Sequence, residues 1–354
     1  MKPRPLPLEL QWKIIQHADN DSDLCSLALC CRNFRDEAQK SLFRHPTAVG
    51  FSQLRNFLEA IICSPTRLAF MVQSYWMVEP SRDNLEAERR IAATALYHMR
   101  HLTSLEVEHP DCIDIVALMH CAFKLEVLIW GSKVTTEETP PMLFDFLGAQ
   151  PTLRRLTIYD HPSAVENREV LRDDPKWCPN LVYLGAQQGF LDIFLAEHRS
   201  IRHLECFRFS SASAELANIP SSRTESVEYL TILTYEPRLD FPFLERMASL
   251  VLLDVITSYT SDTDMHTKLR FLTSTRRLQY LVFTEPLSRY SNKVTTFDTA
   301  QAAFALCHTL KHVDIRQKGW TPGRYDRFYP PQNSGEMERR VVRAHEIYAW
   351  RENP

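Results

Sequence analysis

A short hydrophobic template recurs along most of the chain: an apolar residue, two variable residues, an apolar residue, one variable residue and another apolar residue. Nine copies begin at Leu102, Leu125, Leu153, Leu181, Ile201, Val227, Leu250, Leu278 and Leu310. From the first copy to the last, eight steps cover 208 residues, about 26 residues per step. The second and third apolar positions alternate with variable ones, so each copy predicts a short β-strand with one apolar residue just before it.

The segments between these strands have apolar residues at helical spacing. Helices are expected at Phe51–Cys63, Asn84–Met99, Asp111–Ala122, Pro141–Ala149, Phe190–His198, Thr263–Thr273 and Phe297–Cys307. A degenerate unit near Leu68 to Tyr75 is expected to precede the nine copies. Alternating strands and helices of this period form either a doubly wound parallel sheet or a curved solenoid. The template favours the solenoid, because its three apolar positions all point into a thin core shared with neighbouring units.

The repeat period resembles that of leucine-rich repeats, whose units span 20–29 residues. The match to their consensus is incomplete, because the Asn or Cys expected after the third apolar residue is mostly missing. The spacing also varies, from 20 residues between Leu181 and Ile201 to 32 residues between Leu278 and Leu310. We therefore expect an irregular stack with uneven curvature and long convex loops such as His161–Pro179.

The N-terminal segment has a different pattern, which predicts three short helices. The first is expected over Pro7–Ala18, and the polar run from Asp19 to Ser22 offers N-caps for the second. The apolar residues that share a face in each helix are Leu10, Ile14 and Ala18, then Leu24, Leu27, Ala28 and Cys31, then Phe34, Ala38 and Leu42. A segment of about forty residues buries too little of its own surface to be stable, so it needs a partner surface.

The order and spacing of these residues resemble the F-box, a docking module of ubiquitin ligase subunits. The matching positions are Leu6, Pro7, Glu9, Leu10, Ile14, Ile15, Leu24, Leu27, Cys30, Cys31, Phe34, Leu42 and Phe43. Three positions depart from the usual pattern, since Ala18 replaces a common Leu, and Phe34 and Phe43 replace common Trp residues. Compared with leucine, Ala18 lacks methylene groups whose burial is worth about 0.8 kcal/mol each. Weaker binding to the protein on which the F-box docks is therefore expected. The other interpretation is a helical cap on the repeat domain, and the two roles are compatible.

The resemblance implies that the chain docks on the Skp adaptor of a Skp–cullin–F-box (SCF) ubiquitin ligase and, through it, on a cullin-RING ligase. The residues that it implies for adaptor binding are Leu6, Pro7, Leu10, Ile14, Ile15, Leu24, Leu27, Cys30 and Phe34. With its repeats the chain resembles F-box leucine-rich-repeat proteins, and it is similar to the large F-box families of filamentous and mushroom-forming fungi. The predicted fold is α/β, with a three-helix F-box over residues 1–48 and an irregular leucine-rich-repeat-like solenoid over residues 49–318.

The last segment, residues 319–354, is expected to close the open end of the solenoid with a polar-faced cap. It combines many aromatic residues with Arg and Glu. Arg339–Trp350 is expected to form a final helix or strand that packs Val341, Val342, Ile347 and Tyr348 inward.

Partner specificity is expected on the concave side of the solenoid, where the variable strand positions of successive units align. Tyr159, Tyr183, Phe207, Tyr229 and Tyr280 are predicted to line a contiguous aromatic patch, with Arg155 and Glu205 in its charged rim. Aromatic residues commonly anchor protein–protein interfaces. The alternative is that the register is off by one residue in some units, which would move these rings into the core.

Composition limits the remaining classes of function. The 354 residues carry a formal net charge of −3, unlike the basic surface of a nucleic-acid-binding protein. Eight glycines are about 2% of the chain against ~7% typically, and none forms a phosphate-binding loop. Nine scattered cysteines indicate reduced thiols, and we find neither a signal peptide nor a run of ~18 apolar residues. We therefore expect a soluble cytoplasmic or nuclear protein with no cofactor, nucleic acid partner or membrane contact.

No cysteine or histidine pattern predicts a metal site or a hydrolase. Cys25, Cys30 and Cys31 lack CxxC spacing and are expected to be small buried groups. A second set of such residues, Cys112, His120 and Cys121, is expected on one face of a repeat helix. The chain contains neither a GxSxG nor an HExxH motif.

The leading hypothesis is a substrate-recognition subunit of an SCF-type ubiquitin ligase with no active site of its own. It would hold an unidentified target protein near a charged ubiquitin-conjugating enzyme. A second hypothesis keeps adaptor binding but assigns a scaffold without a cullin. A third is an enzyme with a doubly wound fold misread as repeats, which predicts a deep pocket with converging His and Asp side chains.

Overall fold

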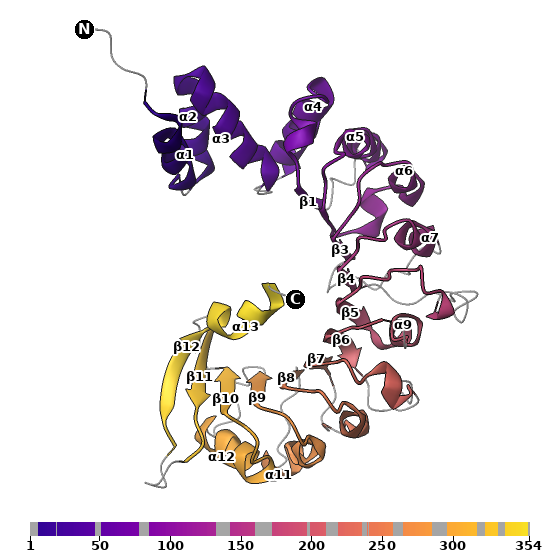
Figure 1. The fold of residues 1–354 in the computed structure, drawn as a ribbon, viewed down its shortest axis with the longest axis vertical. Coiled ribbons are helices and arrows are strands. Elements are labelled where there is room, and N and C mark those ends of the chain that lie inside the picture. The colour runs from indigo at the N-terminus through magenta and orange to yellow at the C-terminus, as the bar shows by residue number, and fades with distance from the viewer. Residues whose placement is uncertain are drawn as a thin grey trace. The chain divides into compact units, whose positions relative to one another are not determined.

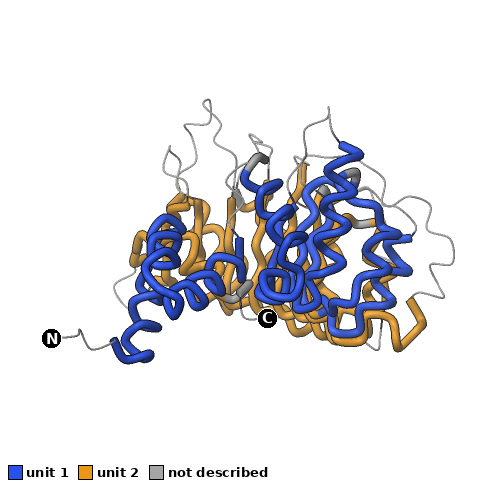
Figure 2. Tube along the Cα trace, turned by 90° about the horizontal axis from the view of Figure 1, so that it is seen from above, with its two compact units in different colours: residues 1–153 blue, residues 154–354 orange. Residues whose placement is uncertain are grey.

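The computed structural model divides the chain into two compact units, unit 1 (residues 1–153) and unit 2 (residues 154–354), coloured separately in Figure 2. The described residues are 6–18, 20–46, 51–77, 85–131, 142–159, 172–196, 199–209, 219–235, 239, 241–257, 265–284, 296–316, 323–331 and 337–352. Both units alternate strands with helices, and most neighbouring strands are parallel, as predicted for an α/β fold.

Unit 1 begins with the three predicted helices, α1 (Leu8–Gln16), α2 (Asp21–Cys30) and α3 (Arg32–Arg44). Pro7 is the N-cap residue of α1, and the Asn20 side chain caps α2 by accepting a hydrogen bond from the Asp23 amide at 2.8 Å. The helices enclose a small core formed by Ile15, Leu24, Ala28 and Ala38, with Ala18, Leu27, Phe34 and Leu42 packed against it.

The first helix faces this core differently from the prediction. Ile15 is buried, whereas Leu10 and Ile14 are 47% and 43% exposed. Cys31 also departs from the prediction, because it lies between α2 and α3 and is exposed. Helices α2 and α3 pack against the side of α1 that carries Ile15. The other apolar residues of α1 therefore lie outside the core.

Three strand units complete unit 1. Its strands β1 (Ser74–Met77), β2 (Ser104–Val107) and β3 (Val127–Trp130) are parallel and pair in chain order. Its remaining helical segments are α4 (Phe51–Cys63), α5 (Leu85–His98), α6 (Ile115–Met119), α7 (Met142–Gly148) and two 3-10 turns at Ala69–Met71 and Pro110–Cys112. The degenerate unit expected near Leu68 to Tyr75 is confirmed, because Val72, Tyr75 and Met77 occupy the three template positions and are buried.

Unit 2 consists of seven parallel strands followed by an antiparallel pair (Figure 1). The parallel strands are β4 (Arg155–Ile158), β5 (Tyr183–Gln187), β6 (His203–Phe209), β7 (Tyr229–Thr234), β8 (Leu252–Thr257), β9 (Tyr280–Thr284) and β10 (His312–Arg316). The helical segments are α9 (Gln188–Phe194), α11 (Met265–Lys268), α12 (Thr296–Leu306) and 3-10 turns at Ser221–Arg223, Pro242–Arg246 and Arg270–Ser274. The helices α9, α11 and α12 lie on the outer side of the curved sheet of unit 2.

All nine predicted templates are confirmed by burial, because none of their apolar positions is more than 6% exposed. A hydroxyl residue just before the first position adds a recurring hydrogen bond. Thr152, Ser226 and Thr309 donate to the carbonyl of the first template residue of the preceding unit, at 2.7, 2.9 and 2.7 Å. The stack is therefore joined by side-chain hydrogen bonds as well as by the strand ladder.

Two predicted helices are interrupted in the structure. The segment expected over Asp111–Ala122 divides into a 3-10 turn and α6, because the Asp114 side chain caps α6 by accepting a hydrogen bond from the Val116 amide. The segment expected over Thr263–Thr273 divides into α11 and a 3-10 turn. Most of the expected convex loop His161–Pro179 lies outside the described residues.

The strand order contradicts the doubly wound alternative. From β4 to β10 each strand pairs with the next one in the chain, whereas a doubly wound sheet reverses its order at a switch point. None of the helices among the described residues is both long and apolar enough to cross a membrane.

The end of unit 2 is closed by β11 (Arg324–Phe328), β12 (Arg339–Arg343) and α13 (Ala344–Glu352). Both strands are antiparallel to their neighbours, so they cover the edge of β10. Val342 and Ile347 are buried and Tyr348 is partly buried, as predicted. Val341 was expected to pack inward but is 52% exposed, because neighbouring residues of a strand point to opposite faces.

Candidate functional site

The first candidate surface is an apolar region on α1 and the residues that precede it. Its members, Leu6, Leu8, Leu10, Trp12 and Ile14, form what we call the α1 apolar surface, and each is between 42% and 56% exposed. Among the described residues fifteen large hydrophobic side chains are exposed, and six of them fall within residues 6–29. Exposed apolar side chains are therefore concentrated in this short segment.

Helix geometry explains why these residues remain outside. Ile15 and Ala18 turn toward the core of the three helices, and the α1 apolar surface flanks this buried stripe on both sides. Gln11 is buried beside them, and its Nε2 donates a hydrogen bond to the Leu6 carbonyl at 2.6 Å. This bond holds the chain before α1 against the helix, so that Leu6 extends the exposed surface.

The structure divides the residues implied for adaptor binding into two groups. Five are exposed, namely Leu6, Pro7, Leu10, Ile14 and Cys30. The other four, Ile15, Leu24, Leu27 and Phe34, are buried or half-buried in the core of the three helices. Leu8, Trp12 and Leu29 are exposed apolar residues that the sequence analysis missed, although the four-residue spacing of Leu8 and Trp12 was a usable signal.

The second candidate surface is the inner face of unit 2, defined as the side chains of β4–β10 that alternate with the buried template residues. The observed register confirms the predicted alignment. His203 lies between Tyr183 and Tyr229, and Glu205 lies beside Gly185. The slip of one residue that was the alternative does not occur at these positions, and the register of β6 against β7 shifts only beyond them, between Cys206 and Phe209.

A row of stacked side chains crosses β4–β7 on the inner face. The Arg155 guanidinium lies 4.3 Å from the centre of the Tyr183 ring, and the His203 ring is centred 6.0 Å from Tyr183 and 4.5 Å from Tyr229. The Tyr183 hydroxyl donates a hydrogen bond to the Glu205 carboxylate. Burial, reinforced by the charge of neighbouring arginines, lowers the pKa of His203 to about 4. Its imidazole is therefore neutral at pH 7.

A second aromatic pair lies beside this row. The rings of Tyr159 and Phe207 are centred 4.5 Å apart. Gly185 leaves room for Phe207, because a Cβ at that position would lie 3.1 Å from the Phe207 ring and 3.1 Å from Thr157. The Gln187 Nε2 donates to the Tyr159 carbonyl at 2.6 Å and holds the end of β4 in place.

The burial of the inner face corrects the prediction of a fully accessible aromatic patch. Tyr183, Phe207 and Glu205 are only 2%, 3% and 8% exposed. The predicted residues that stay half-buried, and so reach solvent, are Arg155, Tyr159, Tyr229 and Tyr280. The cause is the close spacing of neighbouring strands, about 4.8 Å, which lets large rings cover one another.

The C-terminal part of the inner face is occupied by other parts of unit 2. Ile347 of α13 packs in a cluster with Val282 of β9, Tyr325 and Val342. The hydroxyls of Tyr325 and Tyr348 are 2.9 Å apart. This helix therefore covers the inner face around β9, β11 and β12, a contact that the sequence pattern did not predict.

A buried ion pair also lies on this part of the inner face. Arg327 Nε and Nη2 donate to the two carboxylate oxygens of Asp314 at 2.7 and 2.8 Å, and His312 lies 3.4 Å from the same carboxylate. Burial raises the pKa of Asp314, but the hydrogen bonds and charges of Arg327 and His312 outweigh it and leave the pKa lowered. Asp314 is thus held as a carboxylate in a structural pair.

The described residues show no arrangement typical of a metal centre. They contain no group of three or more His, Cys, Asp or Glu side chains able to hold a metal ion. Cys25, Cys30 and Cys31 are exposed rather than buried, which corrects the prediction, because α2 turns Leu24 and Ala28 inward instead. Cys112 also departs from the prediction, since it lies in the 3-10 turn before α6 and not on the helix that precedes His120.

Comparison with known proteins adds only distant structural likeness. No protein-family model matches the chain, and no curated protein matches it. The leucine-rich repeat-containing protein LegL7 from Legionella pneumophila is 14% identical with a TM-score of 0.43, over 71% of this chain and 78% of that chain. The TLR13–ssRNA13 complex is 12% identical with a TM-score of 0.39, over 73% of this chain and 31% of that chain. The α/β repeat architecture therefore follows from the register and burial of the chain itself.

Proposed function

We propose that the chain is the substrate-recognition subunit of an SCF-type ubiquitin ligase. In this proposal residues 6–44 bind the Skp adaptor, and the inner face of unit 2 binds a target protein. The observation that carries it is the α1 apolar surface. The three helices complete their own core without these five side chains and leave them in water. Apolar surface of this kind is stabilised when a partner covers it.

The inner face suits a protein target better than a small substrate. Its half-buried rings, Tyr159, Tyr229 and Tyr280, are held by stacking on their neighbours, so little side-chain entropy remains to be lost on binding. Aromatic residues and arginine are common anchors of protein interfaces, and Arg155 lies beside them. Such a subunit needs no reacting group of its own, because it acts by holding a target lysine near the ubiquitin-conjugating enzyme.

Docking is tested with the double variant Leu10→Asp and Ile14→Asp in the full chain. Both residues are exposed, so the substitutions place charge on the α1 apolar surface without entering the core. Co-purification with the Skp adaptor is expected to be lost. Leu27 is a poor choice for this test, because it packs against the core of the three helices and its substitution by Asp would unfold them.

A matched control carries the same added charge at sites outside the α1 apolar surface. Gln53 and Gln301 are exposed on α4 and α12, outside residues 6–44. The Gln53→Asp and Gln301→Asp variant is expected to bind the adaptor like the wild type. If the Leu10→Asp and Ile14→Asp variant keeps the wild-type circular dichroism spectrum and still co-purifies with the adaptor, the docking proposal is wrong.

Recruitment of a cullin separates a ligase subunit from an adaptor-bound scaffold. A ligase subunit is expected to co-purify with the cullin through the adaptor, and the Leu10→Asp and Ile14→Asp variant is expected to lose both proteins together. If the chain co-purifies with the adaptor but not with a cullin, under conditions in which a known ligase subunit retains its cullin, the scaffold hypothesis is favoured. Proximity labelling with the wild type and a Tyr159→Ser and Tyr280→Ser variant then identifies proteins that depend on the inner face.

A further inference from the structure

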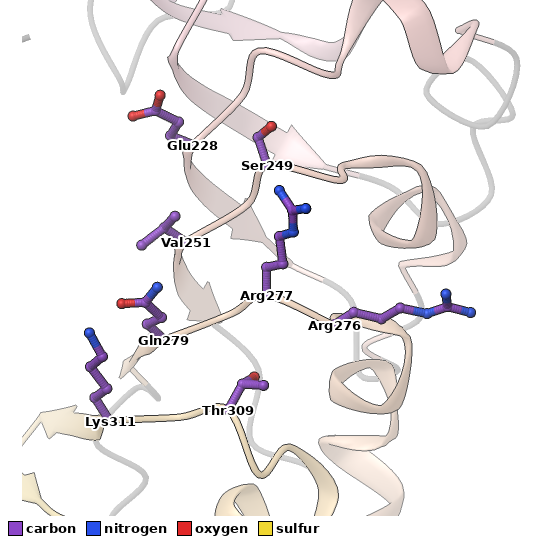
Figure 3. Close-up of a pocket in the computed structure, with 8 residues that line it drawn as sticks. All are labelled: Glu228, Ser249, Val251, Arg276, Arg277, Gln279, Thr309 and Lys311. Carbon is purple, nitrogen blue, oxygen red and sulfur yellow. The ribbon is translucent and has the colours of Figure 1, made fainter.

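A basic groove runs along the edge of unit 2 where strands β7–β10 begin (Figure 3). It encloses about 540 Å³ and is lined by Glu228, Ser249, Val251, Arg276, Arg277, Gln279, Thr309 and Lys311. These residues are separate from the inner face, because they precede the strands instead of lying within them. We call this set the basic groove.

The repeat itself gathers these side chains. One residue before each of the strands β8, β9 and β10 stand Val251, Gln279 and Lys311. Their backbones are hydrogen-bonded in turn: the Lys311 amide donates to the Gln279 carbonyl at 2.7 Å, and the Gln279 amide donates to the Val251 carbonyl at 2.8 Å. Ser249, Arg277 and Thr309 stand three residues before the same strands. Equivalent positions of successive units therefore form two rows, and a partner segment can follow both rows at the spacing of the strands.

The charge of the basic groove is strongly one-sided. Arg276, Arg277 and Lys311 are exposed, whereas Glu228 is the sole acidic residue of the lining. Within the described part of the chain, no ion pair or side-chain hydrogen bond engages Arg276 or Arg277, and the Lys311 ammonium lies 5.9 Å from the Tyr280 ring centre. In Figure 3 Arg277 extends toward Ser249 and Lys311 extends toward Gln279, so both side chains lie along the edge of the sheet where the strands begin. Their positive charge is available to a partner.

A smaller hollow adjoins the groove, and its lining combines four apolar residues with polar and charged ones, including the exposed Glu245. It encloses about 210 Å³, shares Arg276 and Arg277 with the basic groove, and is otherwise lined by Leu244, Glu245, Met247, Ala248, Leu250, Ser274 and Thr275. The two arginines thus stand between a charged channel and a site for an apolar side chain. A partner that carries an apolar residue next to acidic residues matches both features.

We propose that the basic groove binds an extended acidic segment of a partner protein, with anionic side chains beside Arg276, Arg277 and Lys311 and an adjacent apolar side chain in the hollow. The anionic groups are carboxylates or phosphates, because the positively charged groove attracts the negative charge that both groups carry. The inference rests on the proposed target-binding role of unit 2 and extends it from the inner face to the edge of the sheet.

The test uses the full-length chain and a fluorescein-labelled peptide of alternating Glu and Ser with one central Leu. Fluorescence anisotropy is expected to show binding that weakens as salt is added, because exposed charges are screened beyond a Debye length of about 8 Å at physiological ionic strength. A peptide with Gln in place of Glu is expected not to bind. A third peptide, with phosphoserine and Gln, shows whether phosphate or carboxylate is preferred.

The groove is altered with Arg277→Glu and Lys311→Glu together. The affinity for the Glu peptide is expected to fall about tenfold or more, since charged contacts of this kind are worth about 1.4 kcal/mol or more in total. The matched control, Arg270→Glu and Arg324→Glu, makes the same charge change at exposed arginines outside the groove. It is expected to bind like the wild type.

Several outcomes would overturn the inference. The inference is wrong if neither anionic peptide binds the wild type, or if the control variant loses as much affinity for the Glu peptide as the groove variant does. It is also wrong if a single-stranded oligonucleotide binds more tightly than the peptides. Failure of this test is distinguishable from failure of the proposed function, because adaptor co-purification depends on residues 6–44 and is read out without the peptides.

Discussion

The α1 apolar surface and the inner face of unit 2 are both candidate binding surfaces, but they are built in opposite ways. The α1 apolar surface consists of aliphatic and indole side chains that lie outside the core of the three helices and are 42–56% exposed. The inner face consists of rings and charged groups that stack on one another, so that Tyr183 and Phe207 are nearly buried. The first surface lacks a partner within the described residues, whereas the second is largely organised by its own neighbours.

This difference predicts where stability and binding are separable. Side chains of the α1 apolar surface add little to the folded chain, so their substitution should affect binding alone. Side chains of the inner face support each other, so their substitution should affect both properties. The following measurements test the contrast, from the largest expected change in the free energy of unfolding to the smallest.

The largest loss is expected from a template residue of unit 2. Leu230 is fully buried in β7, and Leu230→Ala is expected to lower the free energy of unfolding by about 2–5 kcal/mol, because it removes methyl groups and leaves a cavity. Urea unfolding followed by circular dichroism measures this loss. A loss under about 1 kcal/mol would mean that the template leucines do not form a continuous packed core.

The buried ion pair of the inner face is expected to rank next. Asp314→Ala leaves Arg327 without its carboxylate partner in a mostly buried site and is expected to cost about 2–3 kcal/mol in the same unfolding assay. The comparison is Glu37→Gln, which removes the exposed pair of Lys40 and Glu37 in α3 and is expected to cost under about 0.5 kcal/mol. Equal effects in the two variants would contradict the contrast between the surfaces.

The stacked row should make stability depend on pH. The pKa of His203 is about 4 in the folded chain against the ordinary value of 6.5, so the unfolded chain takes up a proton at a higher pH than the folded chain. The contribution of His203 is therefore complete above pH 6.5 and is lost progressively as the pH falls toward 4. The expected loss is about 2 kcal/mol, allowing for partial access of solvent to the ring. Unfolding assays across this pH range should show a shallower slope in His203→Gln, and an unchanged slope would show that His203 is not responsible.

The smallest change is expected on the α1 apolar surface. Ile14 is 43% exposed, and Ile14→Ala is expected to alter the free energy of unfolding by less than about 0.5 kcal/mol while weakening adaptor binding. The two properties are measured on one preparation, by urea unfolding and by adaptor pull-down. A large loss of stability would mean that Ile14 belongs to the core of the three helices and not to a docking surface.

Most of the fold could be predicted because its signals are local. The template leucines repeat at short, regular spacing, and the hydrogen-bond register aligns His203 with Tyr183 and Tyr229 as predicted. Two of the predicted helices broke because local caps and turns, such as Asp114 before α6, interrupt a pattern that apolar spacing alone treats as continuous. The candidate surfaces were harder to predict, because exposure depends on which neighbours fill the space above each residue.

The sequence by itself determined the strands, their register and the presence of more apolar residues in the N-terminal helices than their core can hold. These properties depend on spacing along the chain, because the periods of helix and strand are set by local backbone geometry. Only the tertiary structure decided that Ile15 and not Ile14 enters the core, that Phe207 lies over Gly185, and that α13 covers part of the inner face. Each of these outcomes depends on contacts between residues of different elements, which the spacing within one element does not specify.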